Sequence, residues 1–382
     1  MKKLSKFFAA VLSAALIISI ASCKDSGSSG KEPASEPVTN AISTLKNVDG
    51  VPKVYTVEFD GEYYLDGAID AELETAADLL AYLNKNIYYW KTAKEAGAPL
   101  TIDVQGSACS SIVAKNANSG TGGYIYGRNF DWDEGPAIII HTMPDGGYES
   151  VSTCYVPFVS EDTNWAPTSD IENNAVSVAG IYVPMDGMNE KGLYIANLND
   201  DIYASASKPA TDDAAKKNVQ TTVAIRYILD KAATVDEALN FLSSIDMIPV
   251  YADQETDTEP VYAYHFAIAD NSGKSVVAEW IHGELKVTDT KIVTNFNIFN
   301  HTDNLAGNCD RFDSLATAGG AANWEMTTAQ VTEALKNVQH GHSEWSAVFE
   351  PSAKRVTYYF RGTSATNDKG PIDYTKPVVV QF

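Results

Sequence analysis

CSSIVAKNANSGTGGYIYGRNFDW, residues 109–132, decides the fold of this chain. Two apolar segments, 110–114 and 124–126, flank a run of Asn, Ser and Gly, and this pattern predicts a β-hairpin. The hairpin brings Arg128 and Asp131 back beside Cys109. From here to the end of the chain, short strand patterns dominate, which indicates sheets with helices packed outside them, an α+β layered design.

The same hairpin suggests a nucleophile. A cysteine reacts as its thiolate, and a nearby cation such as Arg128 stabilises that form. The hairpin contains no histidine to serve as base, so the nucleophile needs an amine. A cysteine at a new N-terminus supplies its own α-amine, for which Asp131 can act as hydrogen-bond acceptor. The sequence therefore predicts cleavage of the Ala108–Cys109 bond.

Hydrophobic spacing and capping residues place the remaining elements. Apolar residues recur at three-and-four spacing over 69–95 and predict a helix. Capping boxes at Thr234 with Glu237, and at Thr327 with Gln330, each predict a helix start. A further helix is expected over 218–232. Strands are expected within 51–64, then at 100–104, 137–141, 176–183, 193–198, 261–268, 275–280, 285–287, 291–293, 345–349, 355–360 and 377–381.

Five later motifs carry a resemblance to a known family. They are Asp186-Gly-Met-Asn-Glu-Lys-Gly-Leu193, Leu198-Asn199, Val293-Thr294-Asn295, Asp310-Arg311-Phe312 and Tyr358-Tyr359. Together with the Gly-Arg-Asn-Phe-Asp-Trp string, and in this order, they resemble the N-terminal nucleophile (Ntn) amide hydrolases. These comprise the choloylglycine hydrolases (bile salt hydrolases and penicillin V acylases) and the branch of acid ceramidase and N-acylethanolamine acid amidase.

The resemblance implies a four-layer αββα sandwich of antiparallel sheets and a catalytic domain over residues 109–382. It implies that Cys109 attacks an amide carbonyl and forms a thioester, which water hydrolyses. Asn199, Asn295 and a backbone N–H are then expected to hold the oxyanion, with each donor contributing roughly 3 kcal/mol. Arg311 is expected to line the site. We expect no cofactor and no metal, because no Cys or His spacing resembles a metal site.

The region before Cys109 departs from the bile salt hydrolase pattern, in which the cysteine almost directly follows the initiator methionine. Here residues 46–108 form an additional region with an amphipathic segment. This resembles the pro-segment of the acid ceramidase branch, which is cut autocatalytically and stays bound as a small subunit. The short gap between Asn295 and Arg311 also resembles that branch. Cys154 and Cys309 could pair or remain free, and the sequence leaves both options open.

The N-terminus indicates secretion. Three lysines precede an apolar run over residues 7–20, which is too short to cross a bilayer and typical of a signal peptide. Ile20-Ala-Ser-Cys23 resembles a bacterial lipobox, so residues 1–22 are predicted to be a lipoprotein signal peptide and Cys23 to be lipidated; an ordinary signal peptide is the alternative. Residues 23–45 are predicted to form a flexible tether. We expect an extracytoplasmic, membrane-anchored lipoprotein.

The function expected from these observations is hydrolysis of a non-peptide linear amide. The substrate is expected to be a small N-acyl compound: a conjugated bile acid, an N-acylethanolamine, an N-acyl amino acid or a penicillin V-like amide, with a lipophilic acyl group preferred. One alternative is an acyltransferase that uses the same thioester, and another is a non-catalytic lipoprotein that binds amphiphiles. The net charge of −22 argues against a nucleic-acid partner. The sequence does not specify an oligomeric state.

Overall fold

A computed structural model of the chain describes residues 36–104, 108–118, 120, 122–203, 215–248, 262–281, 284–361, 370–373 and 375–382. The predicted signal peptide, Cys23 and residues 23–35 of the predicted tether lie outside this part. None of the helices formed by the described residues is both long and apolar enough to cross a membrane.

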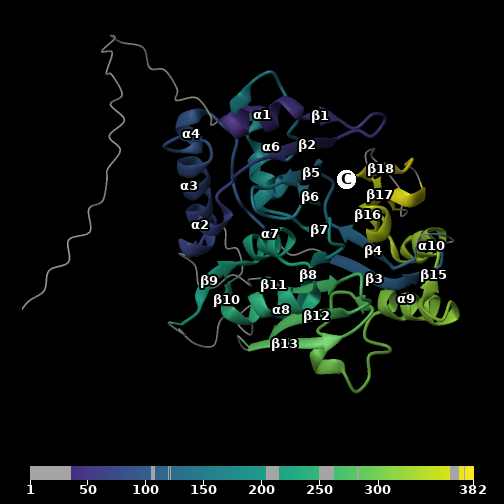
Figure 1. The fold of residues 1–382 in the computed structure, drawn as a ribbon. Coiled ribbons are helices and arrows are strands. Elements are labelled where there is room, and N and C mark those ends of the chain that lie inside the picture. Colours follow the sequence, from purple (N-terminus) through teal and green to yellow (C-terminus); the bar gives the residue numbers. More distant parts are fainter. Residues whose placement is uncertain are drawn as a thin grey trace, which may run out of the picture. The chain divides into compact units, whose positions relative to one another are not determined.

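Two sheets form the centre of the folded unit (Figure 1). Within the described residues, the larger sheet has nine strands. Its order is β1 (Lys46–Asn47), β2 (Val54–Asp60), β5 (Ala137–Met143), β6 (Ser150–Tyr155), β7 (Asp186–Asn189), β8 (Tyr194–Tyr203), β11 (Tyr262–Ala269), β12 (Ser275–Ile281) and β13 (Glu284–Asp289). All neighbouring pairs are antiparallel except β2 and β5, which run parallel.

The second sheet contains the predicted hairpin. Over the described residues it has seven strands: β14 (Ile292–Val293), β3 (Ala108–Asn116), β4 (Tyr124–Asp131), β16 (Ser343–Glu350), β17 (Arg355–Phe360) and β18 (Val378–Gln381) in this order, with β15 (Glu325–Met326) beside β3. The two sheets face each other through aromatic and polar contacts. The rings of Tyr126 and Tyr194 stack with centroids 5.1 Å apart, and Thr153 donates to the hydroxyl of Tyr358.

Helices cover the outer faces, which completes the predicted αββα arrangement. α9 (Asp310–Ala321) and α10 (Thr328–Val338) pack on the seven-stranded sheet. Gly127 in β4 lets α10 approach closely, because a Cβ there would lie 2.8 Å from Val331. On the other side, the larger sheet contacts α1 (Glu36–Thr44), α6 (Val176–Ala179), α7 (Thr221–Lys231) and α8 (Val235–Ser244). β9 (Lys217–Gln220) and β10 (Ile245–Ile248) form a separate parallel pair.

Several elements differ from the sequence expectations. The end of the predicted tether is ordered as α1, because Val38 and Ala41 bury their side chains in the core. The expected helix over 69–95 is divided into α2 (Leu65–Asp70), α3 (Ala76–Asn86) and α4 (Ala93–Ala96). α3 has its own capping box at Thr75 and Asp78, which starts a new helix.

The expected strand over 176–183 is also wrong. This segment forms α6 and a following 3₁₀ turn, with every residue from 176 to 183 buried. A short helix that is buried all around shows no polar face, so its apolar run looks like that of a buried strand. The capping box at Thr327 and Gln330 is confirmed. At Thr234 the hydroxyl caps α8, while the Glu237 carboxylate accepts from Ala233 rather than from Thr234.

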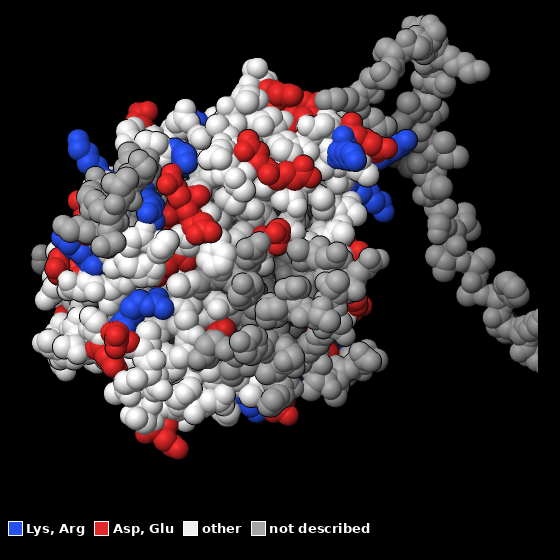
Figure 2. Space-filling view, turned by 180° about the vertical axis from the view of Figure 1, so that it is seen from behind, with Lys and Arg blue, Asp and Glu red and all other residues white. Residues whose placement is uncertain are grey.

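The region before Cys109 is built into the fold. β2 pairs with β5 from Val54 opposite Ala137 to Asp60 opposite Met143. Nearer the predicted cut, the Thr101 and Asp103 amides donate to the chain at 158–159. Residues 46–104 therefore contribute a strand and core contacts to the same unit as the hairpin. On the face drawn in Figure 2, lysine and arginine side chains lie scattered among acidic ones over the described residues.

Candidate active site

Cys109 is the second residue of β3 and is fully buried in the uncut chain. The hairpin register places Cys109 opposite Phe130 and Ser111 opposite Arg128. The thiol points between the two sheets, where it contacts the backbone oxygen of Asn197 in β8, 3.9 Å from Sγ. The predicted nucleophile thus faces the layer between the sheets, and its backbone lies beside the residues predicted to serve it.

Arg128 stands behind the thiol as a buried cation. Its Nε donates to the Asp186 carboxylate at 2.7 Å, and NH2 donates to the Asn197 carbonyl at 2.7 Å. Burial opposes the charge on Arg128, but the Cys109 thiol and the Asp186 carboxylate together raise its pKa above the ordinary value. The guanidinium therefore stays charged, and it shares the Asn197 carbonyl with Sγ, where it can stabilise a thiolate.

Asp186 fixes that cation in place. Its Oδ2 also accepts from the indole N–H of Trp345 at 2.9 Å, and the Trp345 ring stacks on Phe130 at 4.0 Å. Asp186 begins one of the motifs that resemble the family, but the sequence indicates no role for it. Its pairing with Arg128 joins residues 58 positions apart, so no local pattern indicates it.

Asn295 and Arg311 hold the backbone of Cys109. The Cys109 N–H donates to Asn295 Oδ1 at 2.7 Å. NH1 of Arg311 donates to the Cys109 carbonyl, and its NH2 donates to Asn295 Oδ1 at 2.6 Å. Loop 294–299 and the first turn of α9 thus converge on one residue of β3. The structure brings both predicted residues to the nucleophile.

Asp131 lies opposite Ala108, one position from the nucleophile. The structure shows its Oδ2 3.3 Å from NH1 of Arg311 and 3.3 Å from Nε2 of His340, while Oδ1 accepts from Ser343. The acceptor shown for the Cys109 nitrogen is Asn295, whereas the Asp131 carboxylate pairs with Arg311 and accepts from Ser343. His340 and Ser343 are not among the site residues predicted from the sequence.

Asn199 contacts the site through its backbone carbonyl. Its carbonyl accepts from Asn295 Nδ2 at 2.8 Å, which fixes the orientation of the Asn295 amide. Its own side-chain Oδ1 is buried and has no hydrogen-bond partner among the described residues. An amide oxygen is an acceptor, whereas an oxyanion needs a donor, so this unpartnered atom does not supply the contact that the predicted role of Asn199 requires.

A small cavity opens at the predicted cut. It has a volume of 260 Å³ and is lined by Ala108, Asp131, Trp132, Asp133, His340 and His342. Ala108 supplies the carbonyl side of the bond that the sequence predicts to be cut. The cavity gives water and small polar molecules access to this residue, next to the carboxylate of Asp131.

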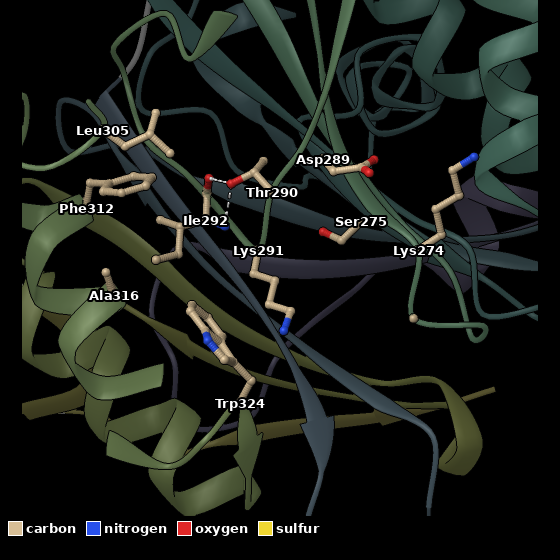
Figure 3. A pocket seen from close by; sticks show the side chains of 11 residues that line it. Lys274, Ser275, Asp289, Thr290, Lys291, Ile292, Leu305, Phe312, Ala316 and Trp324 are labelled. Atoms are coloured by element: carbon tan, nitrogen blue, oxygen red, sulfur yellow. Dashed lines mark hydrogen bonds between the residues drawn. The ribbon is translucent and has the colours of Figure 1, made fainter. Parts of the chain in front are cut away.

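A larger cavity of 610 Å³ lies between α9 and the ends of β12 and β13 (Figure 3). Phe312, Leu305 and Ile292 form its apolar wall, and the ammonium of Lys291 lies 4.7 Å from the ring centre of Trp324. Ile292 lies opposite Ile112, whose side chain packs under α10. The cavity therefore opens on the helix side of the small sheet, whereas Sγ faces the other side.

The three cysteines in the described residues are all free. Cys154 is buried in β6, and burial raises the pKa of its thiol. A Cys154–Cys309 disulfide is therefore not formed. One group in the described part of the chain has ligand atoms close enough together for a metal ion: Asp200, His265 and Glu279.

A family model for linear amide C-N hydrolases, choloylglycine hydrolase family, matches residues 109–329, beginning at the predicted nucleophile Cys109. The chain belongs to this family. Choloylglycine hydrolases with similar sequences include a bile salt hydrolase/transferase of Clostridium perfringens, 33% identical over 31% of this chain and 36% of that protein. A penicillin V acylase of Pectobacterium atrosepticum is 32% identical over 34% of this chain. The aligned stretch spans 36% of each relative.

The fold comparison agrees with the family assignment. A mutant of conjugated bile acid hydrolase from Clostridium perfringens aligns with 72% of this chain and 97% of its own length, with a TM-score of 0.50 and 17% identity. At this identity the likeness supports the Ntn fold and not a substrate. The predicted α+β four-layer class is confirmed for this choloylglycine hydrolase family member.

Proposed function

We propose that this protein hydrolyses a linear amide bond in a small N-acyl compound, with Cys109 as nucleophile after the Ala108–Cys109 bond has been cut. The observation that carries the proposal is the arrangement around Cys109. Asn295 binds its nitrogen, Arg311 binds its carbonyl oxygen, and the buried Arg128 lies next to its thiol across the Asn197 carbonyl.

Maturation comes first in this proposal. Sγ of Cys109 attacks the carbonyl carbon of Ala108, the C–N bond breaks, and the thiol proton passes to the departing nitrogen. Water then hydrolyses the thioester to give an Ala108 carboxylate and a free Cys109 with an α-amine. The cavity of 260 Å³ beside Ala108 offers a path for that water.

Turnover repeats the same steps on a substrate. The α-amine has an ordinary pKa of about 8, which suits a base that accepts and returns a proton near neutral pH. It takes the thiol proton as Sγ attacks the amide carbonyl and gives it to the leaving amine. Asn295 Oδ1 already accepts from this nitrogen in the uncut chain, and it can orient the amine in the same way after the cut.

The pairing of β2 with β5 supports retention of the cut segment. If the chain is cut after Ala108, residues 46–108 remain hydrogen-bonded into the larger sheet from Val54 to Asp60. Core residues such as Val57 and Phe59 add buried apolar contacts. We therefore propose that this segment stays bound as a small subunit.

For the substrate we propose a lipophilic acyl group joined to a small amine. Its support is that two similar proteins are named bile salt hydrolase/transferase and penicillin V acylase. One of these relatives is named a hydrolase/transferase, and this favours a second candidate activity, capture of the same thioester by an amine. Adding an amine such as glycine and comparing the yields of acid and new amide distinguishes the two.

We also propose that the protein is secreted and held at a membrane by lipids on Cys23. The support is the Ile20-Ala-Ser-Cys23 string behind an apolar run of signal-peptide length. A Cys23→Ser variant is then expected in the soluble fraction of cells, whereas the parent partitions with membranes.

Intact mass of the purified protein tests the proposed mechanism. The wild-type chain is expected to give two fragments, one ending at Ala108 and one starting at Cys109, while Cys109→Ala stays uncut. Cys154→Ala is the matched control, because Cys154 is equally buried but lies in the other sheet, and it is expected to cut normally. Only the cleaved protein is expected to release a carboxylic acid from N-acyl amides. An uncut wild type at both acidic and neutral pH, or amide hydrolysis by Cys109→Ala, would refute the mechanism.

A further inference from the structure

Three buried charged side chains form a cluster beside the site that the mechanism does not use. His265 lies in β11, Glu279 in β12 and Asp200 in β8, and they expose at most 4% of their surface. His265 Nδ1 lies 3.1 Å from Glu279 Oε1 and 3.9 Å from Asp200 Oδ2. His265 Nε2 lies 2.7 Å from the Thr294 carbonyl. Strand pairing brings these residues together from three adjacent strands.

Both ring nitrogens of His265 face oxygen atoms, an arrangement in which an imidazolium can donate from both nitrogens. Burial opposes that charge, but the hydrogen bond to Glu279, the nearby Asp200 and the Thr294 carbonyl raise the pKa of His265 overall. The carboxylate oxygens that could bind a metal ion here also accept hydrogen bonds from loop 294–299. Glu279 Oε1 accepts from the Ile298 amide, and Asp200 Oδ2 accepts from Asn297.

All three residues of the cluster form hydrogen bonds with loop 294–299. His265 donates to Thr294, the Asp200 carboxylate accepts from Asn297, and Glu279 accepts from the amides of residues 298 and 299 at 2.7 and 2.8 Å. This loop carries Asn295, whose Oδ1 binds the Cys109 nitrogen. The neighbour of Asp200, Asn199, accepts from the other end of the Asn295 amide. The cluster thus fixes both the loop and the strand that orient Asn295.

We propose that His265 is a positioning residue, which in its imidazolium form ties loop 294–299 to Glu279 and Asp200 and so holds Asn295 against the nucleophile nitrogen. This role rests on the proposed function, since Asn295 matters to chemistry only if Cys109 is the nucleophile. Loss of the contact to Thr294 then lowers the rate of the chemical step and leaves substrate binding nearly unchanged.

Two substitutions of His265 separate its two contacts. A glutamine amide reaches the position of imidazole Nε2 and can still donate to Thr294. An asparagine amide reaches only the position of Nδ1 and can still donate to Glu279. His265→Gln is expected to keep kcat within about tenfold of wild type. His265→Asn is expected to lose about 100-fold in kcat and in self-cleavage rate, with KM changed less than threefold in both.

Asp230→Asn is the matched control, because it disrupts a buried ion pair that lies away from the site. Asp230 pairs with Arg226 inside α7, and both are buried. This variant is expected to melt at a lower temperature with unchanged kcat. Should His265→Asn fail to give a cooperative melt, Asn297→Ala removes one contact of the same loop and is expected to lower kcat while KM is retained.

Equal kcat in the Gln and Asn variants, or losses in kcat that match the control at equal melting temperature, would overturn the positioning role. So would one equivalent of tightly bound metal in the purified wild type, measured by elemental analysis. If the wild type neither cuts itself nor hydrolyses any amide, the proposed function fails and the positioning role fails with it. A working wild type with unaffected variants overturns the positioning role alone.

Discussion

Asp186→Asn is expected to destabilise the protein strongly, because it leaves the Arg128 guanidinium buried without a counter-charge. Both side chains are fully buried, and Nε lies 2.7 Å from Oδ2. Removing one partner of such a pair costs about 3–5 kcal/mol in free energy of unfolding, since the remaining charge stays desolvated. Asparagine keeps an acceptor oxygen for Trp345, so the expected loss reflects the charge more than the hydrogen bond.

The assay is urea unfolding followed by tryptophan fluorescence, with Cys109→Ala as the parent so that the chain stays uncut. A loss of 3–5 kcal/mol corresponds to a fall in melting temperature on the order of 10 °C in a domain of this size class. The control is Asp70→Asn, which breaks the exposed pair with Lys217, and such pairs contribute about 0–1 kcal/mol.

A double variant tests the cause. Arg128→Met with Asp186→Leu removes both charges and keeps similar volumes, so it is expected to recover most of the stability lost in Asp186→Asn. The explanation is refuted if the free energy of unfolding of Asp186→Asn lies within about 1 kcal/mol of its parent. It is also refuted if the double variant is less stable than Asp186→Asn, because the loss would then not come from the unpaired charge on Arg128.

Two further predictions follow from the same structure. Asn295→Ala removes the acceptor for the Cys109 nitrogen and is expected to slow self-cleavage about 100- to 1,000-fold, measured by intact mass over time; cleavage at the wild-type rate would contradict this. Burial raises the pKa of Glu344 to about 8, so the folded protein holds a proton that the unfolded chain releases near pH 4.5, and wild-type stability is expected to fall as pH rises from 4.5 to 8. Glu344→Gln should not show this part of the fall in urea titrations, and a difference from wild type that is independent of pH would refute the assignment.

Local sequence patterns predicted the elements that depend on neighbouring residues. The hairpin of β3 and β4 formed as expected because its turn residues and its two apolar strands are contiguous. The capping box at Thr327 also formed, since a cap needs only residues within one helical turn. The same local reasoning failed at 176–183, where burial on all sides removed the polar face that distinguishes a helix from a strand.

Motif order predicted which residues would gather at the nucleophile, and the structure brings Arg128, Asp131, Asn295 and Arg311 there. It did not predict how they are held. The expected oxyanion role of Asn295 stays a prediction, and the contact of its oxygen with the Cys109 nitrogen was not foreseen. His340 was missed, since nothing in its neighbourhood in sequence indicates a carboxylate partner at Asp131.

The sequence by itself determined the family, the layered α+β class and the position of Cys109 at the start of a hairpin strand, because each of these depends on short strings and local periodicity. Only the tertiary structure decided that Asp186 pairs with Arg128, that His265, Glu279 and Asp200 form one buried cluster, and that residues 46–104 belong to the same folded unit as the hairpin. These contacts join segments far apart in the chain, and it is the packing of two sheets and the pairing of non-adjacent strands that brings them within hydrogen-bonding distance.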